Sequence, residues 1–593
     1  MSSDTFSPKV VRKADKPFEV YDIETTTDLA KCYLVGWYDG KDYLYWESVP
    51  LPPDHPDSAV SQFCAWYFTR KPKGPIYAHN GGNFDHLYIL RWLIEHIPEA
   101  KIEFIPTQSS ILLMTVWVNK RKYEFRDSMR LMVAGLDDIA KTLLGEGKVQ
   151  GINYETLHTD PKRYEYLKRD CLALYLCILK FRSIVVNKLG GAVGLTAAAT
   201  AIETLRTGYL QRTIKTLTPA RENLIREGYY GGRTEVFHSG DSFTSPSLLH
   251  CYDVNSMYVW ALAQPLPCDH VKDTKGQYWN DGNGFVECEV DTRDCDNRSR
   301  RYPVLPYRHE GKLLFPLGRF RGVWTTAEIL LALECGYKLT WVGRGVWFRL
   351  STVFKQYVDT LYKLRDKSLP EYDPTLSAIA KVLGCATYGK FGTNREREKI
   401  HLSPSVEEIL DKEMRPLQGP FDLPVFVENC QSEASYILPH LAAWVTSLAR
   451  ARLLSYIYAC HPYRVYYCDT DSVYTTATIP VGKALGEMKA EYEDIESASF
   501  VAPKVYRLTH SDKHVTTRAK GFAQFGRGFT GDFDSLASGA NMPCSGMSKL
   551  RTVLRGDFGL MLRRKHLLKE GPKRRFLADG SSVPWVIKDG ELT

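Results

Sequence analysis

The sequence predicts a multidomain protein of the α/β and α+β classes, on three observations. The chain has 593 residues, and at about 150 residues per domain this length predicts roughly four units. Hydrophobic residues make up 44% and charged residues 25%, a globular composition that can bury several cores. Short β-rich runs alternate with helical patterns, without a repeat at a period of about 20 to 50 residues. Disordered, collagen-like and solenoid architectures are therefore excluded.

Charge and cysteine content narrow the function classes. Lysine and arginine number 77 and aspartate and glutamate 69; the net charge of +8 fits a phosphate-bearing partner or an ordinary basic enzyme equally well. The 14 cysteines include no C-x-x-C pair, so we expect free thiols and no zinc site. The N-terminus lacks a secretory pattern, and the most apolar long run, 436–460, contains Arg450 and Arg452. We therefore expect a cytoplasmic protein that is neither secreted nor bound to a membrane.

Four carboxylates in the N-terminal third are spaced as a metal site would require. Asp22 and Glu24 fall on one face of a strand predicted over 18–25, because alternate strand residues point the same way. A carboxylate after a second strand, and a carboxylate and a phenol one turn apart on a helix predicted over 164–181, complete the set: Asp85, Asp170 and Tyr166. Converging acids repel unless cations neutralise them, and two divalent ions would also activate a water, oriented by Tyr166, to cleave a phosphodiester. Unrelated surface acids are the alternative.

A second carboxylate set is split across the chain. Asp253 lies in a strand-like run that ends in a turn, and Asp469 and Asp471 lie at the tip of a hairpin predicted over 465–474. Side by side, the strand and the hairpin tip would form another two-metal site, whereas an ordinary acidic turn is the alternative.

A predicted helix between these two segments presents a cation and an aromatic ring. Lys381, Cys385 and Tyr388 fall along one stripe of it. A cation suits a triphosphate, and a ring suits a base. The alternative is an amphipathic helix whose lysine lies along its surface.

In this order the motifs resemble the family B DNA polymerases. Asp-x-Glu, Asn-x3-Phe-Asp and Tyr-x3-Asp resemble the three motifs of proofreading 3′–5′ exonucleases with an RNase-H-like fold. The resemblance runs from Asp22 to Lys520 and is nearest to the protein-primed branch of small linear-genome phages, adenoviruses and linear plasmids, tectivirus-like phage enzymes above all. It implies an exonuclease domain, then a right-hand polymerase domain. The implied boundaries are 1–189 for the exonuclease, 190–524 for palm and fingers (fingers near 355–392, insertions near 300–350 and 393–435) and 525–593 for the thumb.

The resemblance also implies roles for individual residues. Asp253 and Asp471 would ligate the two Mg²⁺ ions of nucleotidyl transfer, with Asp469 supporting and Mn²⁺ as a substitute; Asp22, Glu24, Asp85 and Asp170 would hold the exonuclease metals. The implied nucleotide ligands are Tyr258 as a steric gate against a ribose 2′-hydroxyl, Lys381, Tyr388, Lys367 and Arg365. The implied DNA contacts are Thr25, Asn80, Phe84, Ser128, Met129, Lys148, Tyr229, Gly231, Gly232, Lys504, Tyr506 and Lys520. Cys385 and Ala386 depart from the Asn-Ser of the family.

The leading hypothesis is a DNA-dependent DNA polymerase with proofreading, started by a protein primer. Its partners would be template and primer DNA, deoxynucleotides and a terminal protein held as a heterodimer, in the cytoplasm of a host. A polymerase of the same fold that extends only nucleic-acid primers is the second hypothesis. A binding protein without synthesis is the third, and the acids of the second set disfavour it, because clustered acids repel phosphates. The basic run 563–575 is expected to contact duplex DNA from the thumb or to be a solvated helix end.

Overall fold

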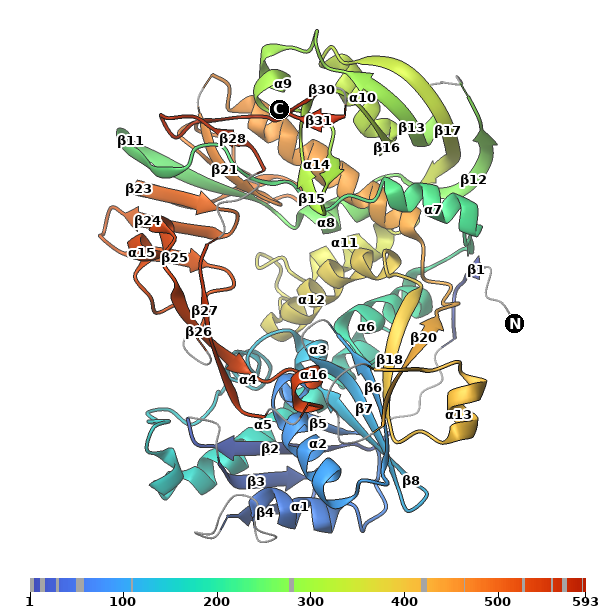
Figure 1. Cartoon of the computed structure of the whole chain (residues 1–593), viewed down its shortest axis with the longest axis vertical. Coiled ribbons are helices and arrows are strands. Elements are labelled where there is room, and N and C mark those ends of the chain that lie inside the picture. Colours follow the sequence, from blue (N-terminus) through green and yellow to red (C-terminus); the bar gives the residue numbers. More distant parts are fainter. Residues whose placement is uncertain are drawn as a thin grey trace.

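The chain folds into two sheet-rich ends joined by a helical layer (Figure 1). The computed structural model describes residues 5–10, 16–27, 31–48, 58–107, 110–276, 282–417, 424–462, 464–524, 528–555, 558–567, 573–588 and 590–593, and of 241–247 it describes the backbone only. Every cysteine is a free thiol, as expected. Within those ranges, the helices are too short or too polar to cross a bilayer.

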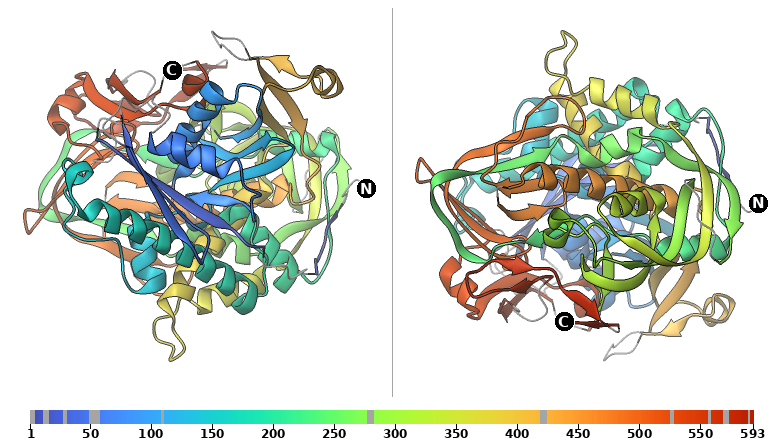
Figure 2. Two further views of the ribbon diagram at one scale, coloured as in Figure 1. Left: turned by 90° about the horizontal axis from the view of Figure 1, so that it is seen from below. Right: turned by 90° about the horizontal axis from the view of Figure 1, so that it is seen from above.

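A ten-stranded sheet of order β19-β20-β18-β6-β7-β8-β5-β2-β3-β4 forms the N-terminal end, with β5 parallel to both β2 and β8. Alternate residues of β2 enter opposite cores: Val20 lies in the core that contains α5, whereas Tyr21 and Ile23 lie in the core of α1 and α2. Figure 2 (left) shows these dark-blue strands from below, with the teal helices in front of them and the blue helices beside them. The N-terminal elements are β2 (Glu19–Thr25), β3 (Cys32–Tyr38), β4 (Tyr43–Glu47), α1 (Ala59–Tyr67), β5 (Ile76–Ala78), α2 (Asp85–His96), β6 (Lys101–Pro106), β7 (Ile111–Val118), β8 (Arg121–Asp127), α3 (Met129–Met132), α4 (Leu136–Leu144), α5 (Lys162–Ser183) and α6 (Ala197–Thr204). The predicted strand over 18–25 and helix over 164–181 are confirmed.

Strands from the predicted insertion near 393–435 widen this sheet. In the antiparallel pair of β18 and β6, Ile400 lies opposite Phe104. Ile400, Leu402 and Val425 enter the same core as α2. The added elements are β18 (Glu396–Leu402), α13 (Val406–Asp411), β19 (Arg415–Pro416) and β20 (Val425–Gln431). This attachment to the N-terminal sheet was not predicted.

A seven-stranded antiparallel sheet of order β10-β21-β22-β11-β23-β24-β25 carries the second carboxylate set. The hairpin predicted over 465–474 is confirmed: β21 and β22 pair across a turn in which Thr470 has φ 64°. Leu453 and Leu454 of α14 pack with Tyr252 and Val473 of the sheet. The elements are β10 (Thr234–Val236), β11 (Gly240–Val254), α8 (Met257–Ala263), α14 (Pro439–Ala459), β21 (Val465–Asp469), β22 (Ser472–Thr475), β23 (Met488–Ala502), β24 (Val505–His510) and β25 (Val515–Ala519).

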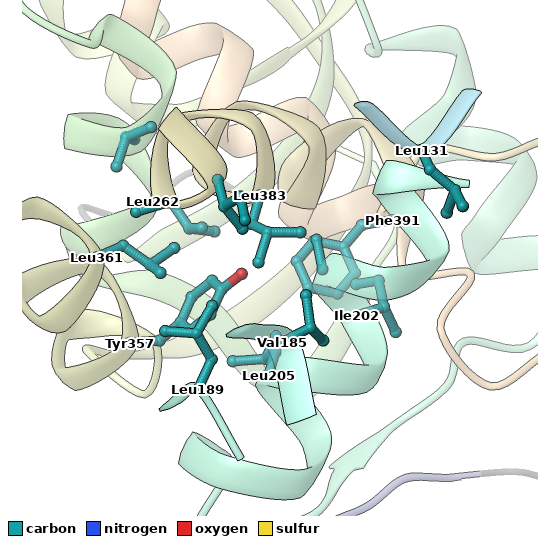
Figure 3. Packing of buried hydrophobic residues seen from close by; sticks show 14 of the residues in the cluster. Leu131, Val185, Leu189, Ile202, Leu205, Leu262, Tyr357, Leu361, Leu383 and Phe391 are labelled. Atoms are coloured by element: carbon teal, nitrogen blue, oxygen red, sulfur yellow. The ribbon is translucent and has the colours of Figure 1, made fainter. Parts of the chain in front are cut away.

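Two helices, α11 (Lys355–Lys363) and α12 (Pro374–Phe391), lie between the ends in the segment predicted as fingers. Asp373 caps α12 by accepting hydrogen bonds from the N–H groups of Thr375 and Leu376 at 2.8 and 3.3 Å. One apolar core joins these helices to both ends: it contains Leu131, Val185, Leu189, Ile202, Leu205, Leu262, Tyr357, Leu361, Leu383 and Phe391 (Figure 3). Because such a core is close-packed, it fixes the two carboxylate sets relative to each other.

A six-stranded sheet of order β12-β17-β13-β16-β30-β31 contains the predicted insertion near 300–350. The C-terminal strand β30 pairs parallel to β16, where Gly318 has φ 102° and a Cβ would lie 2.1 Å from the carbonyl oxygen of Ile587. The elements are β12 (Leu266–Thr274), β13 (Asn283–Asp291), α9 (Asn297–Arg301), β14 (Tyr307–His309), β15 (Lys312–Leu314), β16 (Leu317–Thr325), α10 (Thr326–Glu334), β17 (Lys338–Ser351), β30 (Val586–Lys588) and β31 (Glu591–Leu592).

The segment predicted as a thumb over 525–593 divides in two. Its first part holds α15 (Phe533–Ser538), the hairpin of β26 (Met542–Met547) with β27 (Leu560–Lys565), and α16 (Leu550–Val553), which packs into the core of α2. Its last part, 573–588 and 590–593, returns to the other end of the molecule, where β30 joins the six-stranded sheet and Ser581 forms a bridge with His238. Arg574 there is 1% exposed and donates to the carbonyl oxygen of Arg301 at 2.8 Å and to Ser582 Oγ at 2.9 Å. The expected duplex contact by 563–575 is therefore wrong for Arg574, and residues 568–572 lie outside the described ranges.

Candidate active sites

The first site gathers the four carboxylates of the N-terminal third. Oxygen atoms of Asp22, Glu24 and Asp170 all lie within 4.8 Å of one another. The first two project from one face of β2, and α5, which carries the third, packs across that face. Asp85 begins α2, is 2% exposed and accepts a hydrogen bond from the N–H of Ile23 at 3.0 Å. The grouping predicted from spacing is thus present in three dimensions.

Burial and mutual repulsion raise the pKa values in this site. Desolvation and then Asp170 raise the pKa of Asp22 to about 7. Desolvation and then Asp22 raise the pKa values of Glu24 and Asp85, and burial raises that of Asp170 although Lys148 opposes the shift. Oδ1 of Asp170 is buried without a hydrogen-bond partner among the described residues. Carboxylate oxygens that repel one another in this way are suitable ligands for divalent cations, because a bound ion relieves the repulsion.

Lys148 lies on these carboxylates. Its ammonium pairs with Asp170 and donates to Tyr166 Oη at 3.1 Å. Desolvation disfavours the charge, but Asp170 and Asp22 outweigh it and raise the pKa of Lys148. Burial and Asp170 raise the pKa of Tyr166, so its hydroxyl stays protonated. The resemblance implies a catalytic-site lysine near Lys148 as well as a DNA contact, and the structure places Lys148 against the carboxylate cluster.

Four of the five residues predicted to grip a primer end are half-buried near the ends of β2, β5 and β8: Thr25, Asn80, Phe84 and Met129. Phe84 packs edge-on against Tyr88 at 5.3 Å between ring centroids. Ser128 is the exception, because it is 0% exposed and its hydroxyl donates to the carbonyl oxygen of Ala78 at 3.2 Å. The Ser128 hydroxyl thus fixes the turn after β8, and its contact with DNA stays a prediction.

The second site forms where β11 meets the hairpin tip. Asp253 lies opposite Ser472, and the next residue, Val254, donates its N–H to the carbonyl oxygen of Asp471 at 2.8 Å. Burial, then Asp253 and Asp469, raise the pKa of Asp471 to about 7. Two acids 218 positions apart in the chain are thus adjacent, as predicted, and the carboxyl of Asp471 is electrostatically strained in the same way as the first cluster.

Lysines hold the other two acids of this site. Lys489 on β23 lies 3.1 Å from Asp253 Oδ2. Both oxygens of Asp469 lie 2.8 Å from Lys504 Nζ, and Tyr467 donates to one of them at 3.1 Å. Protein groups therefore bind both oxygens of Asp469, and its predicted place among the metal residues, in support of Asp253 and Asp471, stays a prediction. Lys489 was not predicted, because a lysine on an exposed strand carries no motif.

Aromatic side chains beside the second site form a stacked pair. The rings of Tyr258 on α8 and Tyr388 on α12 are 4.3 Å apart and 10° from parallel. Cys385 and Lys381 lie one and two turns earlier on α12, and both are exposed. Burial raises the pKa of Asp253, and Lys381 is close enough to oppose that shift. Of the other predicted nucleotide ligands, Arg365 donates to Ser256 Oγ at 2.6 Å, and Lys367 is exposed between α11 and α12.

The predicted primer-strand residues meet in one cavity. Asp469, Lys504, Tyr506 and Lys520 line a space of about 440 Å³, together with Thr517, Arg518, Ala519 and Phe529. The backbone N–H of Lys520 donates to the carbonyl oxygen of Lys504 at 3.1 Å, which brings the two predicted lysines together. Arg518 adds a cation that no motif indicated. A cavity lined by three cations beside one carboxylate is suited to a polyanionic strand.

The Tyr229–Gly232 loop lies between these elements and the first insertion. Tyr229, Gly231 and Gly232 were predicted as DNA contacts; Gly231 is exposed, and the other two are half-buried. Buried Arg450 binds carbonyl oxygens of this loop and was missed. The available signal was an arginine inside the apolar run 436–460, which sequence reasoning used only against a membrane span.

Comparison with known proteins decides the family. Residues 68–158 and 153–418 match the family described as DNA polymerase type B, organellar and viral. The chain belongs to this family. It is 25% identical over 527 residues to the DNA-directed DNA polymerase of Enterobacteria phage PRD1, with 86% of each chain covered. The family resemblance seen in the sequence is thereby confirmed.

Other type B polymerases are similar over different lengths. A probable DNA polymerase of Neurospora intermedia is 25% identical over 524 residues, 73% of this chain, which spans about half (51%) of that relative. The DNA polymerase of Bacillus phage phi29 is 23% identical over 499 residues, with 77% of this chain and 79% of that one covered. The phi29 structure in ternary complex with primer-template DNA and nucleotides matches with a TM-score of 0.67 at 18% identity, over 94% of this chain and all of that one. The predicted fold class is confirmed.

Proposed function

We propose that this chain is a DNA-dependent DNA polymerase of a linear genome, with a 3′–5′ proofreading exonuclease and initiation from a terminal protein. The observation that carries the proposal is the presence of two separate carboxylate clusters, of which only the second lies beside a stacked tyrosine pair and a helix with an exposed lysine. An enzyme with hydrolytic activity alone would need only one such cluster, whereas two clusters suit two separate activities. We assign 1–189 to the exonuclease, 190–524 to palm and fingers, and the hairpin with α16 to the thumb. The phage relatives favour the cytoplasm of a host as the compartment.

In nucleotidyl transfer, Asp253 and Asp471 would hold two Mg²⁺ ions, which supply activation of the attacking 3′-hydroxyl and neutralisation of the leaving pyrophosphate. Lys381 binds the triphosphate from α12. Tyr388 packs on the nascent base pair, and Tyr258 occupies the space that a ribose 2′-hydroxyl needs. Lys504, Tyr506 and Lys520 hold the primer strand in their shared cavity. Asp469 keeps Lys504 oriented toward that strand.

In proofreading, the first cluster would hold a second pair of ions. Lys148 neutralises Asp170 and fixes the Tyr166 hydroxyl, which orients the attacking water. Phe84 presents a half-buried ring on which the frayed terminal base can stack. A primer 3′ end that leaves the palm would then be shortened at the first carboxylate cluster of the same molecule.

Two assays test this function. Purified protein with Mg²⁺, deoxynucleotides and a primed template should extend the primer, and without nucleotides it should shorten the primer from its 3′ end. Transfer of labelled deoxyadenylate or another nucleotide onto the product of a neighbouring open reading frame would support protein priming. Extension of DNA primers without any labelled protein across several templates would favour the second candidate, a polymerase that uses nucleic-acid primers alone.

A further inference from the structure

A buried ion pair supports the Tyr229–Gly232 loop from below. Arg450 donates through one guanidinium nitrogen to the carbonyl oxygens of Tyr230 and Gly231, at 2.7 and 2.9 Å. Its other nitrogens bind both carboxylate oxygens of Glu328, at 2.8 and 2.9 Å. Both side chains are 2% exposed. A bidentate pair without access to water has a single favourable geometry, so the position of the arginine fixes the loop.

The first insertion supplies contacts on both sides of this loop. Glu328 lies in the first turn of α10, where Thr325 Oγ donates to it at 3.3 Å and the helix N-terminus favours its charge. Arg308 of β14 donates to the carbonyl oxygen of Tyr229 at 2.9 Å, and its guanidinium lies 5.2 Å from the ring centroid of Tyr230. The palm helix and the insertion therefore hold the loop together.

The loop in turn backs the nucleotide site. A Cβ at Gly232 would lie 2.8 Å from Tyr258 Oη and 3.0 Å from Thr470 Cγ2. Tyr258 stacks on Tyr388 with its ring face. The loop thus confines the hydroxyl of Tyr258, and Tyr388 of α12 confines its ring face. The Tyr258 side chain can move away from the nucleotide only if the loop backbone moves.

We propose that Glu328 and Arg308, acting with Arg450, are positioning residues for sugar selection, so that rejection of ribonucleotides depends on the first insertion. This inference rests on the proposed polymerase function and on Tyr258 as the gate. None of the three touches the nucleotide; they act through the loop backbone. When the loop loosens, Tyr258 gains room to withdraw, and the 2′-hydroxyl of a ribonucleotide is accommodated.

Single-nucleotide insertion kinetics test this proposal. Glu328→Gln removes the charge that holds Arg450, and Arg308→Gln removes the outer contact at an exposed site. The control is Glu289→Gln in the same insertion, because Glu289 pairs with Arg319 and Arg321 away from the loop. The readout is the ratio of kcat/KM for a deoxynucleotide to that for the matching ribonucleotide. We expect the ratio to fall about tenfold or more in the two test variants, in line with the cost of small misplacements at a reacting centre, and to be unchanged in the control.

Exonuclease activity separates positioning from general damage, because the first cluster lies in another sheet and should be unaffected in all three variants. Wild-type sugar selectivity in both test variants would overturn the inference. If Glu328→Gln does not fold, Arg308→Gln alone decides, since its side chain is exposed. A wild-type chain that inserts no deoxynucleotide would refute the proposed function itself, whereas active enzyme with unchanged selectivity refutes only the positioning role.

Discussion

Asp471→Asn tests both the division into two sites and the electrostatics of the palm. Burial, Asp253 and Asp469 raise the pKa of Asp471 from its ordinary 3.8 to about 7. Between these values the folded protein keeps a proton that the unfolded chain has lost. The free energy of unfolding therefore decreases as pH rises from about 4 to 7, and the loss is complete above pH 7.

The size of this effect follows from the two pKa values. A shift from 3.8 to about 7 corresponds to up to about 4 kcal/mol at 1.36 kcal/mol per pKa unit. Asparagine has nearly the same size and never ionises, so the variant escapes this loss. In EDTA at pH 8 the variant should be more stable than the native protein by up to that amount, and near pH 4 the two should be equal. Mg²⁺ at a hundred times its Kd should then stabilise the native palm by about 2.7 kcal/mol and the variant less.

Urea unfolding at pH 4, 6 and 8, with EDTA or Mg²⁺, measures these differences, and primer extension and primer shortening measure the activities. We expect synthesis by Asp471→Asn to fall about a thousandfold or more while 3′–5′ degradation persists. Equal stability of the two proteins at pH 8 would refute the electrostatic account. Equal loss of both activities would refute the division into two sites.

Three further substitutions address the remaining residues. Asp22→Ala combined with Glu24→Ala should abolish 3′–5′ degradation, keep primer extension and raise the error rate measured by sequencing of products; synthesis lost in parallel would contradict separate sites. Tyr258→Val should lower the KM for ribonucleotides about tenfold or more in insertion assays, because the ring that excludes the 2′-hydroxyl is gone, and unchanged selectivity would remove Tyr258 from the gate. Lys148→Met should lower the exonuclease kcat about a hundredfold with extension intact, since Asp170 and Tyr166 lose their shared cation; intact degradation would assign Lys148 no role there.

The periodicity of strands and helices made the relative placement of the carboxylates predictable from sequence. Strand alternation places Asp22 and Glu24 on one face, and a helical turn separates Tyr166 from Asp170. The polar tip between two apolar β runs predicted the hairpin that carries Asp471. In each case the relevant geometry is set within five residues, so the sequence around the site contains it.

The remaining features depend on contacts between distant segments. Glu328 and Arg450 are 122 residues apart, and no local pattern pairs a helix-capping glutamate with an arginine in an apolar run. The pairing of β18 with β6 is equally non-local. The burial of Ser128 is non-local as well, because its hydroxyl donates to the carbonyl oxygen of Ala78, 50 residues earlier in the chain.

Both sites solve one electrostatic problem in the same way. Each places lysines on carboxylates of its cluster, Lys148 on Asp170 in the first, and Lys489 on Asp253 and Lys504 on Asp469 in the second, and so offsets part of the repulsion without a metal. These lysines pair with the other two acids of the second site, so burial, Asp253 and Asp469 still raise the pKa of Asp471 to about 7. A cluster with this remaining repulsion should bind divalent cations more tightly than a fully compensated cluster would. The bound ion relieves repulsion that the protein itself has not relieved. Replacing Lys148 or Lys489 by a neutral side chain removes this offset and should raise the carboxyl pKa values of its own cluster. Metal binding at that site should then depend more steeply on pH, and binding at the other site should be unchanged.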